Sequence, residues 1–401
     1  MELANSYQYL ATPARYYAGV GVLAQIDREV ERAGAERAFI ICSETVSKTT
    51  NLLDRTREAL GDRYGGSWDG CKKESPVPIV LAGLEAVRDA KPDLIVAVGG
   101  GSAVITARAI TILLGEGKTI EEIYTKHIPG EAPRVTRNLA PKLPNILVLT
   151  TPTTGADRGG AAVLDDAHPR RKELYDPKTR PMTIFLDGEA LLTAPLPLYL
   201  ETSVLVFLGS VSSLQTPMLT PFAYADIRQA FDLTTTYLPQ LVARPDDPEP
   251  RIHLGTAALL ANRASQSTYT FGGRGRSHGL GTQIRYLYPH VSQGAIGALM
   301  AVSDMRTNRE LNLGGQTHLA ELIGVRRAGM SDAEAAEEAT SAVSDVLESV
   351  GMPTRLRDIG VQKSDFQALA QYSSEEPGFS RSESLHITDQ VELMKILEDA
   401  W

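Results

Sequence analysis

The sequence predicts an α/β fold in which a doubly wound parallel sheet is followed by an all-helical region. Over the first half of the chain, short apolar runs alternate with segments that have helical periodicity. After about residue 190 the strand signals disappear and helical patterns dominate. We therefore expect an α/β domain over residues 1–190 and a helical domain over residues 191–401.

The predicted strands are runs rich in Ile, Val and Leu, which is typical of parallel strands buried on both faces. They are RAFIIC (37–42), DLIVAV (93–98), NILVLTT (145–151) and TIFLD (183–187). Helical patterns lie before and between them, as in GVLAQIDREVERAG (21–34) and PIVLAGLEAVRDA (78–90). The order strand, helix, strand indicates parallel pairing with helices on the faces of the sheet.

The clearest helix of the second half is SDAEAAEEATSAVSDVLESVGMP (331–353). Ser331 and Glu334 have the spacing of a capping box, and apolar residues then recur at helical intervals. Gly351 and Pro353 are typical of a helix end.

Composition and charge narrow the class of protein. The 401 residues are 43% hydrophobic and 22% charged, as in an ordinary soluble protein, and the apolar runs are shorter than the roughly 20 residues that span a bilayer. A net charge of −9 disfavours nucleic-acid and anionic-membrane partners. Two cysteines and an N-terminus without a signal-peptide pattern predict a cytoplasmic protein.

A glycine loop follows the second predicted strand: Gly99, Gly100 and Gly101 precede Ser102 and a helical pattern. Such a loop lets the backbone approach a diphosphate, and the helix N-terminus offers free N–H groups. A tight turn without a ligand is the alternative, because neither the six-residue Rossmann fingerprint nor a P-loop is present.

A second loop follows the next strand, in LTTPTTGADRGG (149–160). Thr151, Thr153 and Thr154 place hydroxyls beside a backbone that glycine leaves free. Two such loops at the carboxyl ends of strands predict a ligand crevice, and together they favour nucleotide binding.

Five stretches, in this order, resemble the iron-dependent alcohol dehydrogenase superfamily, which has a dehydroquinate synthase-like fold. They are YYAGVGVLAQI, DLIVAVGGGS, TTPTTG, YDPKTRPMTIFLD and VGMPTRLRDIGV. The chain is most similar to the maleylacetate reductase branch. The resemblance implies an N-terminal NAD(P)-binding domain, a helical substrate domain, a cleft between the two domains and a homodimer.

The resemblance also implies a cofactor site. Gly100, Gly101 and Ser102 match the diphosphate loop, and two of the loop threonines match residues that lie along the cofactor. Ser43 stands where many NAD-preferring members carry Asp, which leaves NAD or NADP open. The candidate cofactor-binding residues are Ser43, Gly99, Gly100, Gly101, Ser102, Thr151, Thr153 and Thr154. The chain departs from the family at Ile105 and Arg108, where Asp and Lys are usual.

The metal site of the family is degenerate in this chain. The resemblance aligns Leu205 and Gly209 with an Asp and a His that bind metal, and neither can do so. His290 matches the last ligand. His278 lies near the third, but only 12 residues before His290, and the family's further catalytic His has no counterpart. Two histidines without a carboxylate make a poor iron or zinc site, so we expect no catalytic metal.

Cationic side chains could replace a metal in orienting the substrate carbonyl and stabilising the alkoxide that forms from it. The candidate catalytic residues are His278, His290, Arg276, Arg285 and Arg158. Arginine pairs well with a carboxylate, and histidine can give a proton to an alkoxide near neutral pH. The alternative is that the histidines are structural and the arginines belong to a solvated loop.

Three functions remain open on the sequence. The first is a metal-independent NAD(P)-dependent reductase of a small carbonyl compound, with a carboxylated substrate as a reasonable case. The second is a non-redox enzyme, such as a lyase, cyclase or isomerase of a specialised biosynthetic pathway, on the same scaffold. The third is a catalytically silent subunit.

Overall fold

The computed structural model describes residues 2–9, 13–126, 133–165, 170–265, 278–375 and 389–401. Contacts between Cα atoms divide the chain into two compact units. The sheet unit comprises residues 11–195 and 246–262, and the helical unit comprises residues 1–10, 196–245 and 263–401. The chain thus leaves the sheet unit after residue 195 and returns to it once.

A six-stranded parallel sheet forms the centre of the sheet unit, in the order β2-β9-β6-β5-β3-β4. The strands are β2 (Arg15–Gly19), β3 (Ala38–Ile41), β4 (Tyr64–Trp68), β5 (Leu94–Gly99), β6 (Asn145–Leu149) and β9 (Thr183–Asp187). The four predicted strands are confirmed and lie side by side. The edge strands β2 and β4 were not predicted, because RYYAG and YGGSW lack a continuous apolar run.

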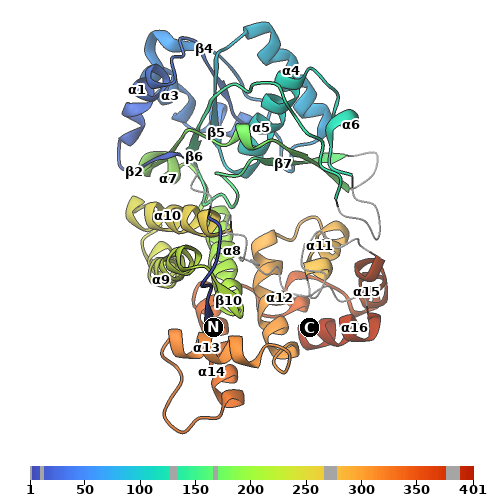
Figure 1. Ribbon diagram of the computed structural model, residues 1–401. Helices are drawn as coiled ribbons and strands as arrows, with labels where there is room; N and C mark the ends of the chain where they lie inside the picture. Colours follow the sequence, from blue (N-terminus) through green and yellow to red (C-terminus); the bar gives the residue numbers. More distant parts are fainter. Residues whose placement is uncertain (1, 10–12, 127–132, 166–169, 266–277, 376–388) are drawn as a thin grey trace. The chain divides into compact units, whose positions relative to one another are not determined.

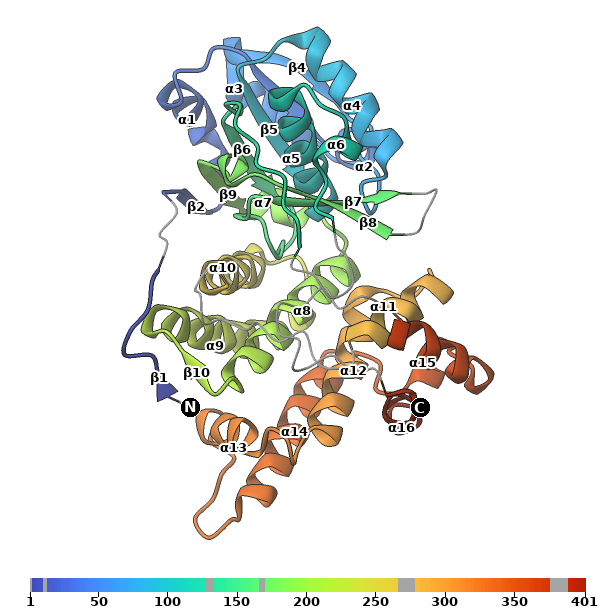
Figure 2. The same ribbon diagram turned by 45° about the vertical axis from the view of Figure 1, so that its right-hand side comes forward.

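Helices cover both faces of this sheet, as the doubly wound fold predicts (Figures 1 and 2). Helices α1 (Ile26–Arg32) and α3 (Leu52–Leu60) lie on one side, and α4 (Val77–Ala90) and α5 (Gly101–Glu116) lie on the other. Successive strand residues point to opposite faces of the sheet. Because helices cover both faces, all residues of β3, β5, β6 and β9 are buried.

The strand order places a reversal of direction between β3 and β5. From β3 the chain first adds β4 on one side, and then returns to add β5 on the other side of β3. In open parallel sheets, ligands bind outside the carboxyl ends of the strands at such a switch point. The loops after β3 and β5 therefore occupy the favoured position for a ligand.

Smaller elements complete the sheet unit. An antiparallel hairpin joins β7 (Gly160–Asp165) and β8 (Arg170–Tyr175). Short helices are α2 (Glu44–Thr49), α6 (Ile120–Ile123) and α7 (Gly188–Leu192). Most of α10 (Pro248–Ala264) also belongs here, because Arg251 Nη1 donates to the carbonyls of Leu191 and Ala194, each at 2.7 Å.

The helical unit contains α8 (Leu196–Leu214), α9 (Pro221–Ala243), α11 (His278–Leu287), α12 (Gln293–Thr307), α13 (Leu313–Leu322), α14 (Asp332–Ser349), α15 (Phe366–Glu375) and α16 (Gln390–Asp399). The helix predicted after Ser331 is confirmed as α14, with the capping box in place and Gly351 at φ 74° beyond its end. A short parallel pair, Glu2–Leu3 with Met218–Leu219, was not predicted.

Helix α8 is apolar on nearly every side. It is the one helix among the described residues that is long and apolar enough to cross a membrane by length and composition. Of the window that meets this criterion, 56% is buried inside the structure, and the core helix of a soluble protein meets it equally well.

Candidate active site

The glycine loop, residues 99–102, joins β5 to α5 at the carboxyl edge of the sheet. Gly99 has φ 145°, a conformation that side chains other than glycine rarely adopt. Among the described residues, no side chain caps the N-terminus of α5 at Gly100. The first turn of a 16-residue helix therefore presents backbone N–H groups at this edge.

The threonine loop, residues 150–160, follows the neighbouring strand β6 and touches the glycine loop. Thr151 and Thr153 are buried, and their hydroxyl oxygens are 3.2 Å apart, whereas Thr154 is exposed. A Cβ on Gly100 would stand 2.8 Å from Thr151 Oγ1, and one on Gly101 would stand 3.8 Å from Thr153 Cγ2. The two loops predicted to form a crevice are thus in contact.

Arg108 holds the far part of the threonine loop. This buried side chain of α5 donates to the carbonyls of Gly160 (2.7 Å), Ala156 (2.7 Å) and Gly155 (3.3 Å). Burial lowers the pKa of Arg108 to about 10, against the opposing effect of Asp157, so the guanidinium stays charged near neutral pH. Arg108 stands where Lys is usual in the family. Its hydrogen bonds fix the threonine loop to α5 within the sheet unit.

Asn262 holds the near part of the same loop and was not predicted. Its side chain comes from the end of α10, accepts a hydrogen bond from the Gly155 N–H at 2.6 Å, and donates to the Thr153 carbonyl at 3.1 Å. No pattern in the sequence marks a buried asparagine as the partner of a loop 107 residues away.

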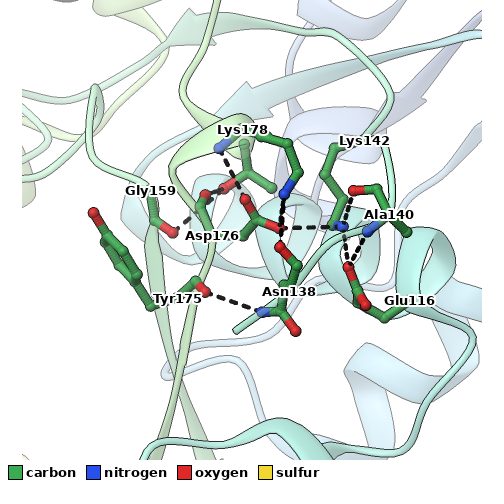
Figure 3. A network of polar contacts seen from close by, with 9 residues as sticks. Glu116, Asn138, Ala140, Lys142, Gly159, Tyr175, Asp176 and Lys178 are labelled. Atoms are coloured by element: carbon green, nitrogen blue, oxygen red, sulfur yellow. Dashed lines mark hydrogen bonds and ion pairs between the residues drawn. The ribbon is translucent and has the colours of Figure 1, made fainter. Parts of the chain in front are cut away.

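A buried ion-pair network fixes the end of the threonine loop (Figure 3). The Asp176 N–H donates to the Gly159 carbonyl at 2.8 Å, and a Cβ on Gly159 would stand 2.7 Å from the Asp176 carbonyl oxygen. Lys142 Nζ lies 2.6 Å from Glu116 and 3.1 Å from Asp176, and Lys178 Nζ also lies 3.1 Å from Asp176. Burial raises the pKa of Asp176, but hydrogen bonds from Lys178 and Lys142 outweigh burial and keep this pKa below its usual value.

Ser43 lies at the switch point, two residues after the end of β3. Its hydroxyl accepts a hydrogen bond from the Val46 N–H at 3.4 Å and begins α2. The next residue, Glu44, is exposed and pairs with Lys48 at 3.1 Å and Lys72 at 3.5 Å. These lysines partly compensate the negative charge of Glu44, which stands next to the position that the resemblance aligns with an Asp of NAD-preferring members.

The candidate catalytic residues fall in different units. Arg158 is an exposed residue of the threonine loop in the sheet unit, and its Cδ lies 3.3 Å from the position of a Cβ on Gly155. Arg285 and His290 belong to the helical unit, on and just after α11. Arg276 and the side chain of His278 lie outside the described residues.

His290 is exposed and stands beside a structural tyrosine. His290 Nε2 lies 3.4 Å from the Ile359 carbonyl oxygen, and its ring meets the Tyr288 ring edge-on at 6.1 Å. Tyr288 donates to Asp365 and accepts from the Gln362 N–H at 3.0 Å. Burial, with Asp365, raises the pKa of Tyr288, which fits a packing role for this residue better than that of a proton donor.

The two α8 residues that the resemblance aligns with metal ligands of the family cannot bind an iron ion. Leu205 Cδ2 lies 3.1 Å from the position of a Cβ on Gly297, so this side chain packs against α12, and Gly209 offers no donor. In the part of the chain that the structure describes, no group of three or more His, Cys, Asp and Glu side chains could hold a metal. Among the described residues, the donor set is therefore too poor for iron.

Comparison with known proteins matches both halves of the chain to one family. Residues 13–188 match the iron-containing alcohol dehydrogenase profile, and residues 202–401 match the C-terminal profile of the Fe-containing alcohol dehydrogenase family. The chain is 25% identical over 362 residues to the NAD-dependent methanol dehydrogenase of Bacillus methanolicus, covering 89% of this chain and 91% of that one. It is 22% identical over 377 residues to maleylacetate reductase 1 of Rhodococcus opacus, covering 94% and 92%.

A solved structure of 1,3-propanediol oxidoreductase has the same fold. It superposes with a TM-score of 0.85 at 23% identity, over 99% of this chain and all of that chain. Its agreement with the described elements confirms the predicted α/β and helical architecture. The chain therefore belongs to the iron-containing alcohol dehydrogenase family and is an NAD(P)-dependent oxidoreductase.

Proposed function

We propose that this protein reduces a small carbonyl compound with NADH or NADPH and works without a catalytic metal. The proposal is supported by a cofactor-type pair of loops that occurs together with the loss of metal ligands. The sheet unit has two loops in contact at the carboxyl edge of the sheet, while Leu205 and Gly209 stand where the resemblance aligns two metal ligands of the family.

The cofactor site would use the loops at the carboxyl edge of the sheet. The diphosphate would bind at the N-terminus of α5, where residues 99–102 present backbone N–H groups. Thr151, Thr153 and Thr154 would lie along the cofactor, and Ser43 would face the adenosine ribose. The name of the Bacillus methanolicus relative supports NAD, and Ser43 would also admit NADP.

Bound NAD(P)H supplies the hydride, and the side chains must orient the carbonyl group and supply the proton. Arg158, Arg276 and Arg285 are the candidates to bind a substrate carboxylate, since guanidinium groups pair with carboxylates through two N–H groups. His278 or His290 would give a proton to the alkoxide oxygen. A carboxylated substrate is supported by the similarity to maleylacetate reductase 1.

We further propose that the sheet unit acts as the dinucleotide-binding domain, expected over residues 1–190, and that the helical unit acts as the substrate domain, expected over residues 191–401. The protein would work as a cytoplasmic homodimer, with a small-molecule substrate and no nucleic-acid or membrane partner. These proposals rest on family resemblance, composition and net charge.

Calorimetric titration tests the proposal directly. Chelator-treated protein would be titrated with NAD⁺, NADH, NADP⁺ and NADPH, and we expect one reduced cofactor to bind tightly without added metal. Ser102→Glu places a carboxylate at the diphosphate position and should abolish this binding. Carbonyl compounds, with carboxylated ones first, would then be screened by the loss of reduced-nicotinamide absorbance.

The opposite result points to the second function. If none of the four dinucleotides binds the wild-type protein, the reductase proposal is wrong. A lyase, cyclase or isomerase on the inherited scaffold then becomes the better interpretation, because the departures at Leu205, Gly209 and Ile105 would reflect changed chemistry.

A further inference from the structure

We propose that Asn262 is a positioning residue of the cofactor site, a role that rests on the dinucleotide binding proposed above. Asn262 belongs to α10, outside the segment that forms the sheet, yet its side-chain amide makes two hydrogen bonds to the threonine loop. The side chain is buried, with the residue only 2% exposed.

The two bonds fix the loop backbone in one orientation. The Asn262 carbonyl oxygen accepts from the Gly155 N–H at 2.6 Å, and its amide nitrogen donates to the Thr153 carbonyl at 3.1 Å. Arg108 binds the carbonyl of the same Gly155 at 3.3 Å. Gly155, at φ 84°, is therefore held through both its N–H and its C=O by side chains from two different helices.

The orientation of the loop determines where the threonine hydroxyls stand. Thr153 Oγ1 lies 3.2 Å from Thr151 Oγ1 and also donates to the Thr151 carbonyl at 3.2 Å. The Asn262 amide donates to the carbonyl of Thr153. The same short stretch of backbone, residues 151–153, carries the two threonine hydroxyls, so the hydrogen bond of Asn262 helps to fix their positions. A loop held this way is ordered before a ligand arrives, which lowers the cost of binding.

Helix α10 is itself fixed to the sheet unit. Arg251 of this helix donates to the carbonyls of Leu191 and Ala194, each at 2.7 Å, and is 3% exposed. A Cβ on Gly188 would stand 2.8 Å from Pro248 Cβ, so α10 also packs tightly at its beginning. Asn262 thus acts from a rigid base.

The test compares Asn262→Ala with a matched control, Asn145→Ala. Asn145 is also a buried asparagine, and its amide donates to the Thr179 carbonyl at 3.0 Å. It lies at the amino end of β6, whereas the two loops follow the carboxyl ends of their strands. For each protein, the dissociation constants of NADH and NADPH would be measured by nicotinamide fluorescence. The melting temperature and amide hydrogen exchange over residues 151–160 would be measured without cofactor.

We expect Asn262→Ala to weaken binding of the preferred cofactor by about tenfold and to speed exchange at the Gly155 amide. Asn145→Ala should change the dissociation constant less than about twofold, whatever it does to the melting temperature. Asn262→Asp keeps the acceptor for the Gly155 N–H but loses the donor to Thr153. It should therefore keep the Gly155 amide protected while still weakening binding.

Three results would overturn the proposal and are distinguishable. If Asn262→Ala binds the cofactor as tightly as wild type, Asn262 does not position the site. If Asn145→Ala weakens binding equally, the effect is general destabilisation. If wild-type protein binds neither NADH nor NADPH, the proposed function fails, and the positioning role falls with it.

Discussion

Thr151 Oγ1 lies 2.8 Å from the point where a Cβ on Gly100 would stand, so a side chain at position 100 does not fit against the threonine loop. We expect Gly100→Ala to lower the free energy of unfolding by about 1–3 kcal/mol, because the added methyl group must displace a buried hydroxyl. Gly101→Ala is the control, since its Cβ would make an ordinary 3.8 Å contact with Thr153.

Urea unfolding of the two variants checks this prediction. Gly101→Ala should stay within about 0.5 kcal/mol of wild type. Cofactor binding should weaken in Gly100→Ala, because the displaced Thr151 belongs to the proposed site. Equal stability of the two variants would contradict the close packing of the loops.

The Lys142 network gives a second prediction (Figure 3). The side chains of Lys142 and Asp176 are fully buried, and that of Glu116 is 6% exposed. Lys142→Met would leave two carboxylates buried without this cation, so we expect a loss of about 3–5 kcal/mol in the free energy of unfolding. Lys178→Met removes a 39% exposed side chain and should cost less than about 1 kcal/mol. Denaturant unfolding of both variants measures the difference, and similar losses would contradict it.

The central strands could be predicted from the sequence because burial on both faces requires continuous apolar runs. This requirement does not hold at the sheet edges, where β2 has exposed positions and β4 contains two glycines. The hairpin β7–β8 was missed for a related reason, since RRKELY is largely polar.

The two loops of the candidate site could be located in the sequence because glycine and threonine directly after a strand indicate a loop that can approach a ligand. The anchors of these loops could not. Asn262 contacts Gly155 across 107 positions of sequence. Asp176 stabilises the threonine loop only through its contacts with Lys142 and Gly159, which lie near it only in the folded chain. Arg108 was noticed as a departure from the family, but its three carbonyl partners could not be inferred from one sequence.

Glu29 makes the stability depend on acid pH. Burial of its carboxyl raises the pKa, but hydrogen bonds from Thr183 (2.7 Å) and Tyr17 (2.8 Å), with the charges of Arg32 and Arg15, outweigh burial and keep the pKa below its usual 4.5. The unfolded chain therefore binds a proton at a higher pH than the folded one. The stabilisation is complete above about pH 4.5 and is lost as the pH falls through the lower folded pKa.

Tyr17→Phe tests this assignment. Removal of one donor should cost about 2 kcal/mol at neutral pH and raise the folded pKa of Glu29 toward its usual value. The variant should consequently lose less stability than wild type between about pH 5 and pH 3 in urea unfolding. A pH dependence identical to that of wild type would show that the hydroxyl does not stabilise the carboxylate.

The two cysteines should be chemically silent in the folded protein. Burial raises the pKa of Cys42 and of Cys71 to about 12, and both residues are at most 4% exposed. Since the thiolate is the nucleophile, we expect no reaction with an aromatic disulfide reagent at about pH 8 and release of two thiols after unfolding. Rapid reaction of the native protein would mean that the loops after β3 and β4 open readily.

Metal content gives the last prediction. Leu205 packs against the position of Gly297 and Gly209 carries no side chain, so α8 supplies no donor at the family's ligand positions. We expect elemental analysis of the purified protein to find far less than one equivalent of iron or zinc. Prolonged treatment with a chelator should leave both the melting temperature and dinucleotide binding unchanged. One equivalent of metal, removed by the chelator together with activity, would mean that His290 and residues outside the described part of the chain bind the ion without α8.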